Sequence, residues 1–215
     1  MDNEMRSRLN HLRKGGIPGT KEEFRLMYED WAIDYDKEIL CDFAYKLCKP
    51  MTVMFDAALN TFTKKRRQDI KIIDIAAGTG LIGLELHKMG YTSLHALDSS
   101  QKMLNEARKK GIYTQFFCLP IDDQRILEIN TGDYDALICV NGFGNNHILP
   151  SALAEMCRIV VKGGLLCFDI REQCMEEWED KLKELERKGM WETVTKEKLP
   201  VDDDDKTNAF VFKLL

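Results

Sequence analysis

Apolar residues in the first part of the chain recur at the spacing of helices. Around residues 24–32, 39–47 and 50–62 they return every three to four positions, which predicts three helices with one apolar face each. Pro50 stands at the start of the third pattern, and proline suits a first helical turn because that turn needs no backbone N–H donor. We expect residues 1–66 to form an N-terminal helical segment that packs on the rest of the chain.

Beyond residue 66 the apolar pattern changes to that of strands alternating with helices. Five short apolar runs predict strands and lie at residues 70–75, 93–97, 113–118, 135–140 and 165–170. Helical patterns and polar connections between these runs predict a doubly wound α/β fold with a mainly parallel sheet. Two last runs, 191–201 and 209–215, have no helix between them and predict an antiparallel hairpin. We therefore expect a seven-stranded core over residues 67–215.

The turn after the first strand carries the strongest chemical signal. Residues 74–83 contain Gly78, Gly80 and Gly83 at the spacing of a dinucleotide-binding fingerprint. The same stretch has Asp74 ahead of the first two glycines, which suggests S-adenosylmethionine instead. A carboxylate next to two phosphates is repelled, whereas one next to the cationic amino-acid part of S-adenosylmethionine is attracted. The sequence favours S-adenosylmethionine, and an NAD(P)-binding Rossmann oxidoreductase stays the alternative.

A second candidate ligand group lies at the end of the next strand. Ligands of open α/β sheets bind beyond the carboxyl ends of the strands. The turn after the first strand and the turn after the second strand would therefore face the same site. Gly78 and Gly80 leave the backbone free to bend and to approach a ligand closely. Asp98 ends the second strand, where its carboxylate can accept both hydroxyls of a ribose. Because either cofactor contains adenosine, Asp98 alone does not decide between them.

Four stretches resemble motifs of the class I, or seven-strand, S-adenosylmethionine-dependent methyltransferases. These stretches are residues 74–80, 97–104, 134–140 and 158–164, and in the last of them Lys162 replaces the usual proline. Residues 16–18, 28–36 and 189–192 further resemble one subgroup, the methyltransferase-like protein of the Williams–Beuren syndrome chromosome region and its relatives. The resemblance spans roughly residues 16–200 and implies a Rossmann-like methyltransferase with N-terminal lid helices. It also implies S-adenosylmethionine as cofactor and S-adenosylhomocysteine as product.

The resemblance implies a set of residues for each part of the cofactor. Three lid aromatics would cover the methionine end, the glycine turn would hold the amino-acid group, and Asp98 would bind the ribose. Leu119 would flank the adenine at a position where many relatives carry an aspartate. The implied cofactor-binding residues are Tyr28, Trp31, Tyr35, Asp74, Ala76, Gly78, Gly80, Asp98, Ser99, Met103, Leu119, Asn141 and Phe143.

The catalytic residues are less clearly marked than the cofactor site. Transfer of a methyl group from a sulfonium needs alignment and exclusion of water rather than a metal or a covalent nucleophile. Asn141 and His147 follow the fourth strand and are the candidate catalytic residues, and His147 could act as a general base. By pattern alone, Tyr28, Trp31 and Met103 fit core packing as well as ligand contact. We expect no metal site, and a non-catalytic cofactor-binding protein stays open.

Composition limits the possible partners and the compartment. The net charge of −5 gives no general attraction to nucleic acid, and no Asp/Asn-Pro-Pro-Tyr motif follows the fourth strand. We therefore expect a small-molecule or protein acceptor, no nucleic acid, and a monomer. The seven cysteines form no Cys-x-x-Cys pair, which indicates reduced thiols. With no apolar run near about 18 residues and no secretion signal, we expect no membrane association and a cytoplasmic protein, with nuclear entry left open.

Overall fold

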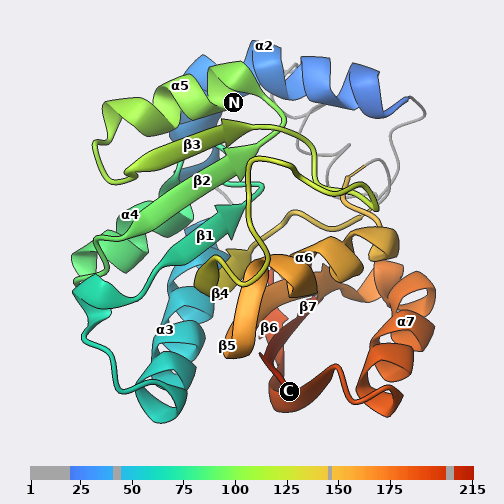
Figure 1. Cartoon of the computed structure of the whole chain (residues 1–215). Helices are drawn as coiled ribbons and strands as arrows, with labels where there is room; N and C mark the ends of the chain where they lie inside the picture. Colours follow the sequence, from blue (N-terminus) through green and yellow to red (C-terminus); the bar gives the residue numbers. More distant parts are fainter. Residues whose placement is uncertain (1–19, 41–44, 145–146, 202–205) are drawn as a thin grey trace.

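The computed structural model describes residues 20–40, 45–144, 147–201 and 206–215, and within them it forms one mixed sheet flanked by helices (Figure 1). The strands are β1 (Ile72–Ile75), β2 (Leu94–Asp98), β3 (Gln115–Cys118), β4 (Tyr134–Cys139), β5 (Val160–Arg171), β6 (Trp191–Pro200) and β7 (Lys206–Leu214). The α-helices are α2 (Lys21–Leu40), α3 (Tyr45–Phe62), α4 (Leu81–Lys88), α5 (Gln101–Lys109), α6 (Leu153–Ile159) and α7 (Met175–Arg187). Three 3₁₀ turns complete the described elements at Arg67–Asp69, Pro150–Ala152 and Glu172–Cys174.

The seven strands have the order β3-β2-β1-β4-β5-β7-β6. β1 to β5 pair in parallel, and β7 pairs antiparallel with both β5 and β6. The predicted doubly wound sheet with a C-terminal antiparallel hairpin is therefore confirmed. The strand order reverses beside β1, which has β2 on one side and β4 on the other. In such sheets this reversal opens a crevice at the carboxyl ends of the strands.

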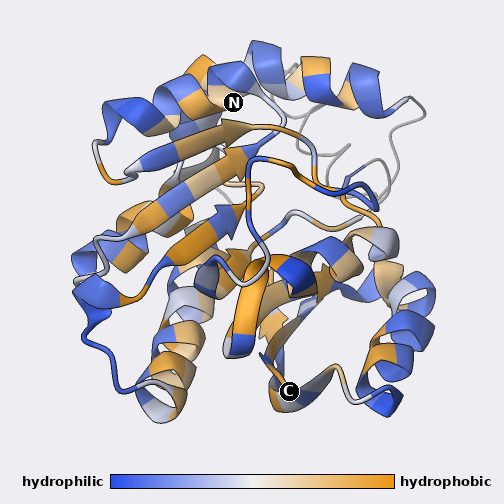
Figure 2. Ribbon diagram, in the orientation of Figure 1, coloured by the Kyte–Doolittle hydropathy of each residue, from blue (hydrophilic) through white to orange (hydrophobic). Residues whose placement is uncertain are grey.

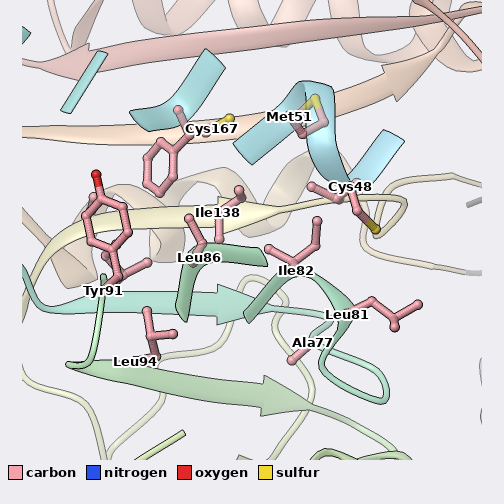
Figure 3. Packing of buried hydrophobic residues seen from close by; sticks show 14 of the residues in the cluster. Cys48, Met51, Ala77, Leu81, Ile82, Leu86, Tyr91, Leu94, Ile138 and Cys167 are labelled. Carbon is pink, nitrogen blue, oxygen red and sulfur yellow. The ribbon is translucent and has the colours of Figure 1, made fainter. Parts of the chain in front are cut away.

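Two hydrophobic clusters cover the two faces of the sheet. On one face, residues of α3, α4 and α5 pack against the sheet, and Figure 3 shows Met51, Ile82, Leu86 and Ile138 among them. On the other face, α6 and α7 pack through Leu153, Met156 and Trp178. The strands are mostly apolar, whereas the outer sides of the helices are mostly polar (Figure 2). β1 is buried along its whole length, as expected for a central parallel strand.

The N-terminal helices differ from the sequence prediction in their ends. α2 continues through residues 33–38 to Leu40, where we expected a break, and residues 41–44 of the second predicted helix lie outside the described part. In the continued helix Tyr35 packs on Trp31 with ring centroids 4.7 Å apart, so both side chains belong to one inward face. The start of a helix at Pro50 is also wrong, since α3 begins at Tyr45 and contains the proline.

The packing of α3 explains why it accepts a proline inside. Proline removes one backbone hydrogen bond and favours helix starts over helix interiors. Leu47 and Met51 on either side are fully buried against the sheet, and this burial offsets the lost bond. None of the described helices has the length and apolar character needed to cross a lipid bilayer.

Candidate active site

The turn after β1 lies at the crevice and bends through left-handed backbone. Ala76, Gly78 and Gly80 have φ of 54°, 54° and 89°. Such angles suit glycine but are strained for alanine, and strained residues cluster at functional sites. A Cβ placed on Gly78 would meet no atom within 4 Å, so open space lies over this part of the turn. The turn therefore presents bare backbone to that space.

Asp98 holds this turn to the start of the next helix. Its Oδ2 accepts a hydrogen bond from the Gly78 N–H at 2.8 Å, and its Oδ1 accepts one from the Ser100 N–H, also at 2.8 Å. Burial raises the pKa of Asp98, although these backbone donors act in the opposite direction. Ser100 caps α5 by accepting from the Met103 N–H at 3.2 Å. A carboxylate has about four lone-pair directions, so two stay available to further donors.

The residues next to Asp98 differ in exposure. Ser99 is exposed beside the carboxylate, while Met103 is buried and only 1% accessible. Leu119 is half-buried, and its N–H donates to the carbonyl of Asp98 at 3.1 Å. The backbone bond brings the start of the β3 loop next to the end of β2, so Leu119 borders the same crevice.

Asp74 lies beneath the turn rather than on its surface. It is 1% exposed, and Tyr113 donates its hydroxyl proton to Oδ2 at 2.5 Å. Burial raises the pKa of Asp74 to about 7, against the opposing effect of the Tyr113 hydrogen bond. The Gly83 N–H in turn donates to the Tyr113 hydroxyl oxygen at 3.2 Å. Sequence reasoning missed Tyr113, because a tyrosine at the start of a strand gives no sign of a partner in another strand.

Gly83, the third glycine of the fingerprint, makes room for the Tyr113 ring. A Cβ on Gly83 would lie 2.2 Å from the Tyr113 hydroxyl oxygen and 2.3 Å from its Cζ. Tyr113 is buried and cannot move aside freely. We therefore expect Gly83→Ala to lower the free energy of unfolding by about 2 kcal/mol, as overpacking does in well-packed cores.

Chemical denaturation measures this loss directly. Glu177→Ala is a suitable control, because Glu177 is an exposed helical residue on the opposite face and its removal should change stability by less than about 0.5 kcal/mol. Equal midpoints for Gly83→Ala and the wild type would contradict the assigned contact.

The aromatic residues of α2 gather over the same end of the sheet. Tyr28 stacks on Trp31 with ring centroids 6.0 Å apart, and Tyr35 lies 4.7 Å from Trp31. Trp31 is fully buried, and its Nε1 donates to Glu38 Oε2 at 2.5 Å. Burial raises the pKa of both tyrosines, and the negative charge of Asp98 adds to the effect in each. The two tyrosines therefore lie within reach of the Asp98 charge.

Polar contacts tie the C-terminal half of α2 to the glycine turn. Asp36 accepts a hydrogen bond from the Thr79 hydroxyl and an ion-pair contact from Lys110 Nζ at 2.6 Å. Lys110 Nζ also donates to the carbonyl of Thr79 at 2.6 Å. α2 thus covers the turn and lies against α5, as Figure 1 shows.

The loop after β4 forms the other wall of the crevice. Asn141 has φ of 56°, and its N–H donates to Asp169 Oδ1 at 2.7 Å. Among the described residues, Asn141 Oδ1 is a buried oxygen without a hydrogen-bond partner. Phe143, by contrast, is buried with its ring 5.1 Å from that of Phe168 and 4.3 Å from that of Trp178. The ring of Phe143 therefore packs in the core under this loop.

His147 returns from this loop to the aromatic face of α2. Its Nε2 lies 3.2 Å from the Tyr28 hydroxyl, and its ring centroid lies 4.3 Å from that of Phe24. The crevice thus brings together the predicted residues of α2, the glycine turn, Asp98, Asn141 and His147. Five of the predicted residues are buried and lie below its surface, namely Trp31, Asp74, Gly80, Met103 and Phe143. No cluster of three potential metal ligands occurs in the described part of the chain.

Comparison with known proteins is consistent with this geometry. Residues 72–164 match a protein-family model described as a methyltransferase domain. Methyltransferase-like protein 27 of Homo sapiens is 29% identical over 194 residues, which cover 88% of this chain and 75% of that protein. Residues 72–164 are thus a methyltransferase domain, and the chain has the fold of the class I S-adenosylmethionine-dependent methyltransferases.

Further relatives and solved structures agree with this family. The demethylmenaquinone methyltransferase of Corynebacterium efficiens is 31% identical over 96 residues, 45% of this chain and 39% of that protein. The magnesium protoporphyrin IX methyltransferase of Synechocystis PCC 6803, crystallised with bound S-adenosylhomocysteine, has a TM-score of 0.66 at 10% identity, covering 89% of this chain and 99% of that one.

The match to a methyltransferase domain decides between the two interpretations of the glycine pattern. The protein is a methyltransferase that uses S-adenosylmethionine, and the oxidoreductase alternative has no support from these comparisons. Gly83, the third glycine of the pattern, serves packing here, because a Cβ on it would meet the Tyr113 ring.

Proposed function

We propose that the methyl donor lies across the carboxyl ends of β1, β2 and β4, with its ribose on Asp98. The observation that carries this proposal is the Asp98 carboxylate, which joins the Gly78 N–H to the Ser100 N–H and keeps lone pairs for two more donors. The two ribose hydroxyls are such donors. Ser99 would lie beside the ribose, Leu119 would border the adenine, and the buried Met103 would support that part of the site from below.

The amino-acid end of the cofactor would rest on the turn after β1. Ala76 and Gly78 are half-buried, and Gly78 borders open space, so this part of the turn can approach a ligand closely. Asp74 lies directly beneath, where its negative charge would favour the cationic ammonium group. The ring of Phe143 packs in the core, so it would support the loop that carries Asn141 rather than touch the cofactor.

The methyl group would pass to the acceptor by in-line displacement. A lone pair of the acceptor atom forms the new bond to the methyl carbon, while the electrons of the breaking C–S bond return to sulfur and leave a neutral thioether. When the acceptor atom carries a proton, His147 Nε2 would take it as general base. Its contact with Tyr28 supports this role, because Tyr28 belongs to the same lid that would exclude water. Asn141 would orient the acceptor beside it.

We further propose a small-molecule or protein acceptor, a monomeric enzyme and a cytoplasmic location. The net charge of −5 supports an acceptor other than nucleic acid. Cys118, Cys139, Cys157 and Cys167 are free thiols, which supports a reducing compartment. Residues 1–66 would act as the lid segment of this enzyme, with residues 67–215 as its core.

Hydrogen exchange with and without S-adenosylhomocysteine tests the cofactor site and the lid together. We expect the product to slow amide exchange across residues 28–35 by about tenfold or more at saturation, because a ligand under α2 stabilises its closed position. NADH at equal concentration should have no effect. α7, on the far face, serves as the internal reference and should be unchanged. Unchanged exchange across residues 28–35 would count against the lid, and protection by NADH would count against the cofactor site.

A further inference from the structure

Thr79 lies between Gly78 and Gly80 in the glycine turn and is held by two groups from other parts of the chain. Its hydroxyl donates a hydrogen bond to Asp36 Oδ1 on α2, and its carbonyl accepts one from Lys110 Nζ at 2.6 Å. Lys110 Nζ also lies 2.6 Å from Asp36 Oδ2, so the three residues form a closed network. Thr79 is only 1% exposed. We name this network of Asp36, Thr79 and Lys110 the Thr79 anchor.

The conformation of the turn explains why an anchor at Thr79 matters. Gly78 and Gly80, on either side, have φ of 54° and 89°, and glycine restricts the backbone less than any other residue does. A loop that must be ordered when a ligand binds lowers the affinity by the cost of that ordering. Asp98 fixes the Gly78 N–H, and the Thr79 anchor fixes the carbonyl of the following residue. Together these contacts hold the turn in one conformation before a ligand arrives.

The anchor is a closer contact than the ion pair at the other half of α2. α2 and α5 run side by side, as Figure 1 shows. In the N-terminal half of α2, Asp30 Oδ1 lies 3.4 Å from Lys102 Nζ, and both side chains are more than half exposed. In the anchor the distance between Asp36 Oδ2 and Lys110 Nζ is 2.6 Å, and the lysine side chain is 17% exposed. Because solvent screens exposed ion pairs, we expect the anchor to have the larger effect.

We propose that Asp36, Thr79 and Lys110 are positioning residues for the amino-acid end of the cofactor. The anchor holds the backbone between Gly78 and Gly80 in the conformation on which the amino-acid group would rest. The inference rests on the proposed function, which places that group on the turn after β1. It has a specific consequence, because loss of the anchor should weaken the binding of ligands that carry an amino-acid end and spare ligands that lack it.

Two ligands that differ in the amino-acid end test this inference. S-adenosylhomocysteine carries it, whereas methylthioadenosine has the same adenosine and thioether but ends in a methyl group. Titration calorimetry with each ligand gives the ratio of the two affinities for every variant. We expect Asp36→Ala to weaken the binding of S-adenosylhomocysteine by about tenfold or more, as an added ordering cost at one backbone residue would. The same variant should bind methylthioadenosine nearly as the wild type does.

Variants of Thr79 remove or keep the same contact without changing α2. Thr79→Val keeps the size of the side chain and loses the hydroxyl, so it should lower the ratio of affinities as Asp36→Ala does. Thr79→Ser keeps the hydroxyl and should bind both ligands nearly as the wild type does. The double variant of Asp36→Ala and Thr79→Val should show little further loss, because both substitutions act on one contact.

Asp30→Ala is the matched control for Asp36→Ala. It removes a carboxylate from the same helix and breaks the exposed pair with Lys102, so the affinity for S-adenosylhomocysteine should stay close to that of the wild type. Alanine favours helices more than aspartate does, so neither substitution is expected to unfold α2. Should Asp36→Ala fail to fold, the comparison of Thr79→Val with Thr79→Ser decides the matter.

The outcomes separate this inference from the proposed function. If Asp36→Ala and Thr79→Val bind S-adenosylhomocysteine as tightly as the wild type does, the anchor does not position the turn and the inference is wrong. Equal losses for both ligands would also overturn it, because the anchor would then act on the fold or on the whole lid. Failure of the wild type to bind S-adenosylhomocysteine would refute the proposed cofactor site instead. Equal affinity of the wild type for both ligands would refute the proposed position of the amino-acid end.

Discussion

Replacing Asp98 by alanine is expected to weaken the binding of S-adenosylhomocysteine by at least about a hundredfold. A hydrogen bond to a charged group contributes about 1.5–3 kcal/mol, and two ribose hydroxyls would lose such a bond. The substitution also frees the Gly78 and Ser100 N–H groups, which Asp98 holds at 2.8 Å each. The turn and the start of α5 would then lose their common anchor, so the loss should exceed that of the ribose contacts alone. Titration calorimetry measures it directly.

Two further variants identify the source of that loss. Asp98→Asn keeps one acceptor oxygen and should bind with an intermediate affinity. Asp123→Ala removes an exposed carboxylate from the connection after β3 and should bind as the wild type does. Near-normal affinity of Asp98→Ala would disprove the ribose assignment. A low affinity that goes with a lowered unfolding midpoint would show instead that Asp98 acts mainly on the fold.

The sequence predicted the sheet because its signals are local. Each strand of the core is a short apolar run, and the lack of a helix between β6 and β7 already indicates their antiparallel pairing. The ends of the N-terminal helices were wrong because they depend on distant contacts. Asp36 extends α2 through its ion pair with Lys110, and α3 tolerates Pro50 because of its burial against the sheet. Neither contact leaves a trace in the local pattern.

Sequence reasoning likewise found the parts of the candidate site that have local signals and missed those that depend on distant contacts. The glycine turn and Asp98 were found because their spacing within a strand–turn–helix unit is itself the signal. Tyr113 and Asp169 were missed, since each acts through a hydrogen bond to a residue at least 28 positions away in the chain. His147 was predicted only from its place in the loop after β4. Its contact with Tyr28, which lies 119 positions away in the chain, could not be predicted. Pairings of this length need the fold before they can be recognised.

Replacing Asp74 by asparagine is expected to make the protein more stable at pH 8 and to leave its stability nearly unchanged at pH 4. Burial raises the pKa of Asp74 in the folded protein from 3.8 to about 7. Between these values the folded state holds a proton that the unfolded state has released, so the wild type loses stability as the pH rises. Above about pH 7 both states are ionised and the loss is complete. The asparagine does not titrate, and its Oδ1 can still accept from the Tyr113 hydroxyl.

The size of the effect follows from the same pKa values. A rise of the pKa from 3.8 to about 7 corresponds to about 4 kcal/mol, an upper bound that relaxation of the buried site reduces. Urea denaturation of both proteins between pH 4 and pH 8 gives the difference in unfolding free energy at each pH. Asp123→Asn replaces an exposed carboxylate, serves as the control and should show no such trend. A difference that is the same at pH 5 and pH 8 would rule out a raised pKa at Asp74.

The stability that Asp74 removes near neutral pH implies a compensating role in function. A buried, ionised carboxylate destabilises the fold, and residues of this kind persist at sites where their charge is used. The cationic ammonium of the proposed methyl donor would lie above the turn, and its attraction would favour the ionised form. Asp74→Asn should therefore bind S-adenosylhomocysteine more weakly at pH 8 even though it is more stable there. A gain in stability with unchanged affinity would show that Asp74 supports Tyr113 and the turn without acting on the cofactor.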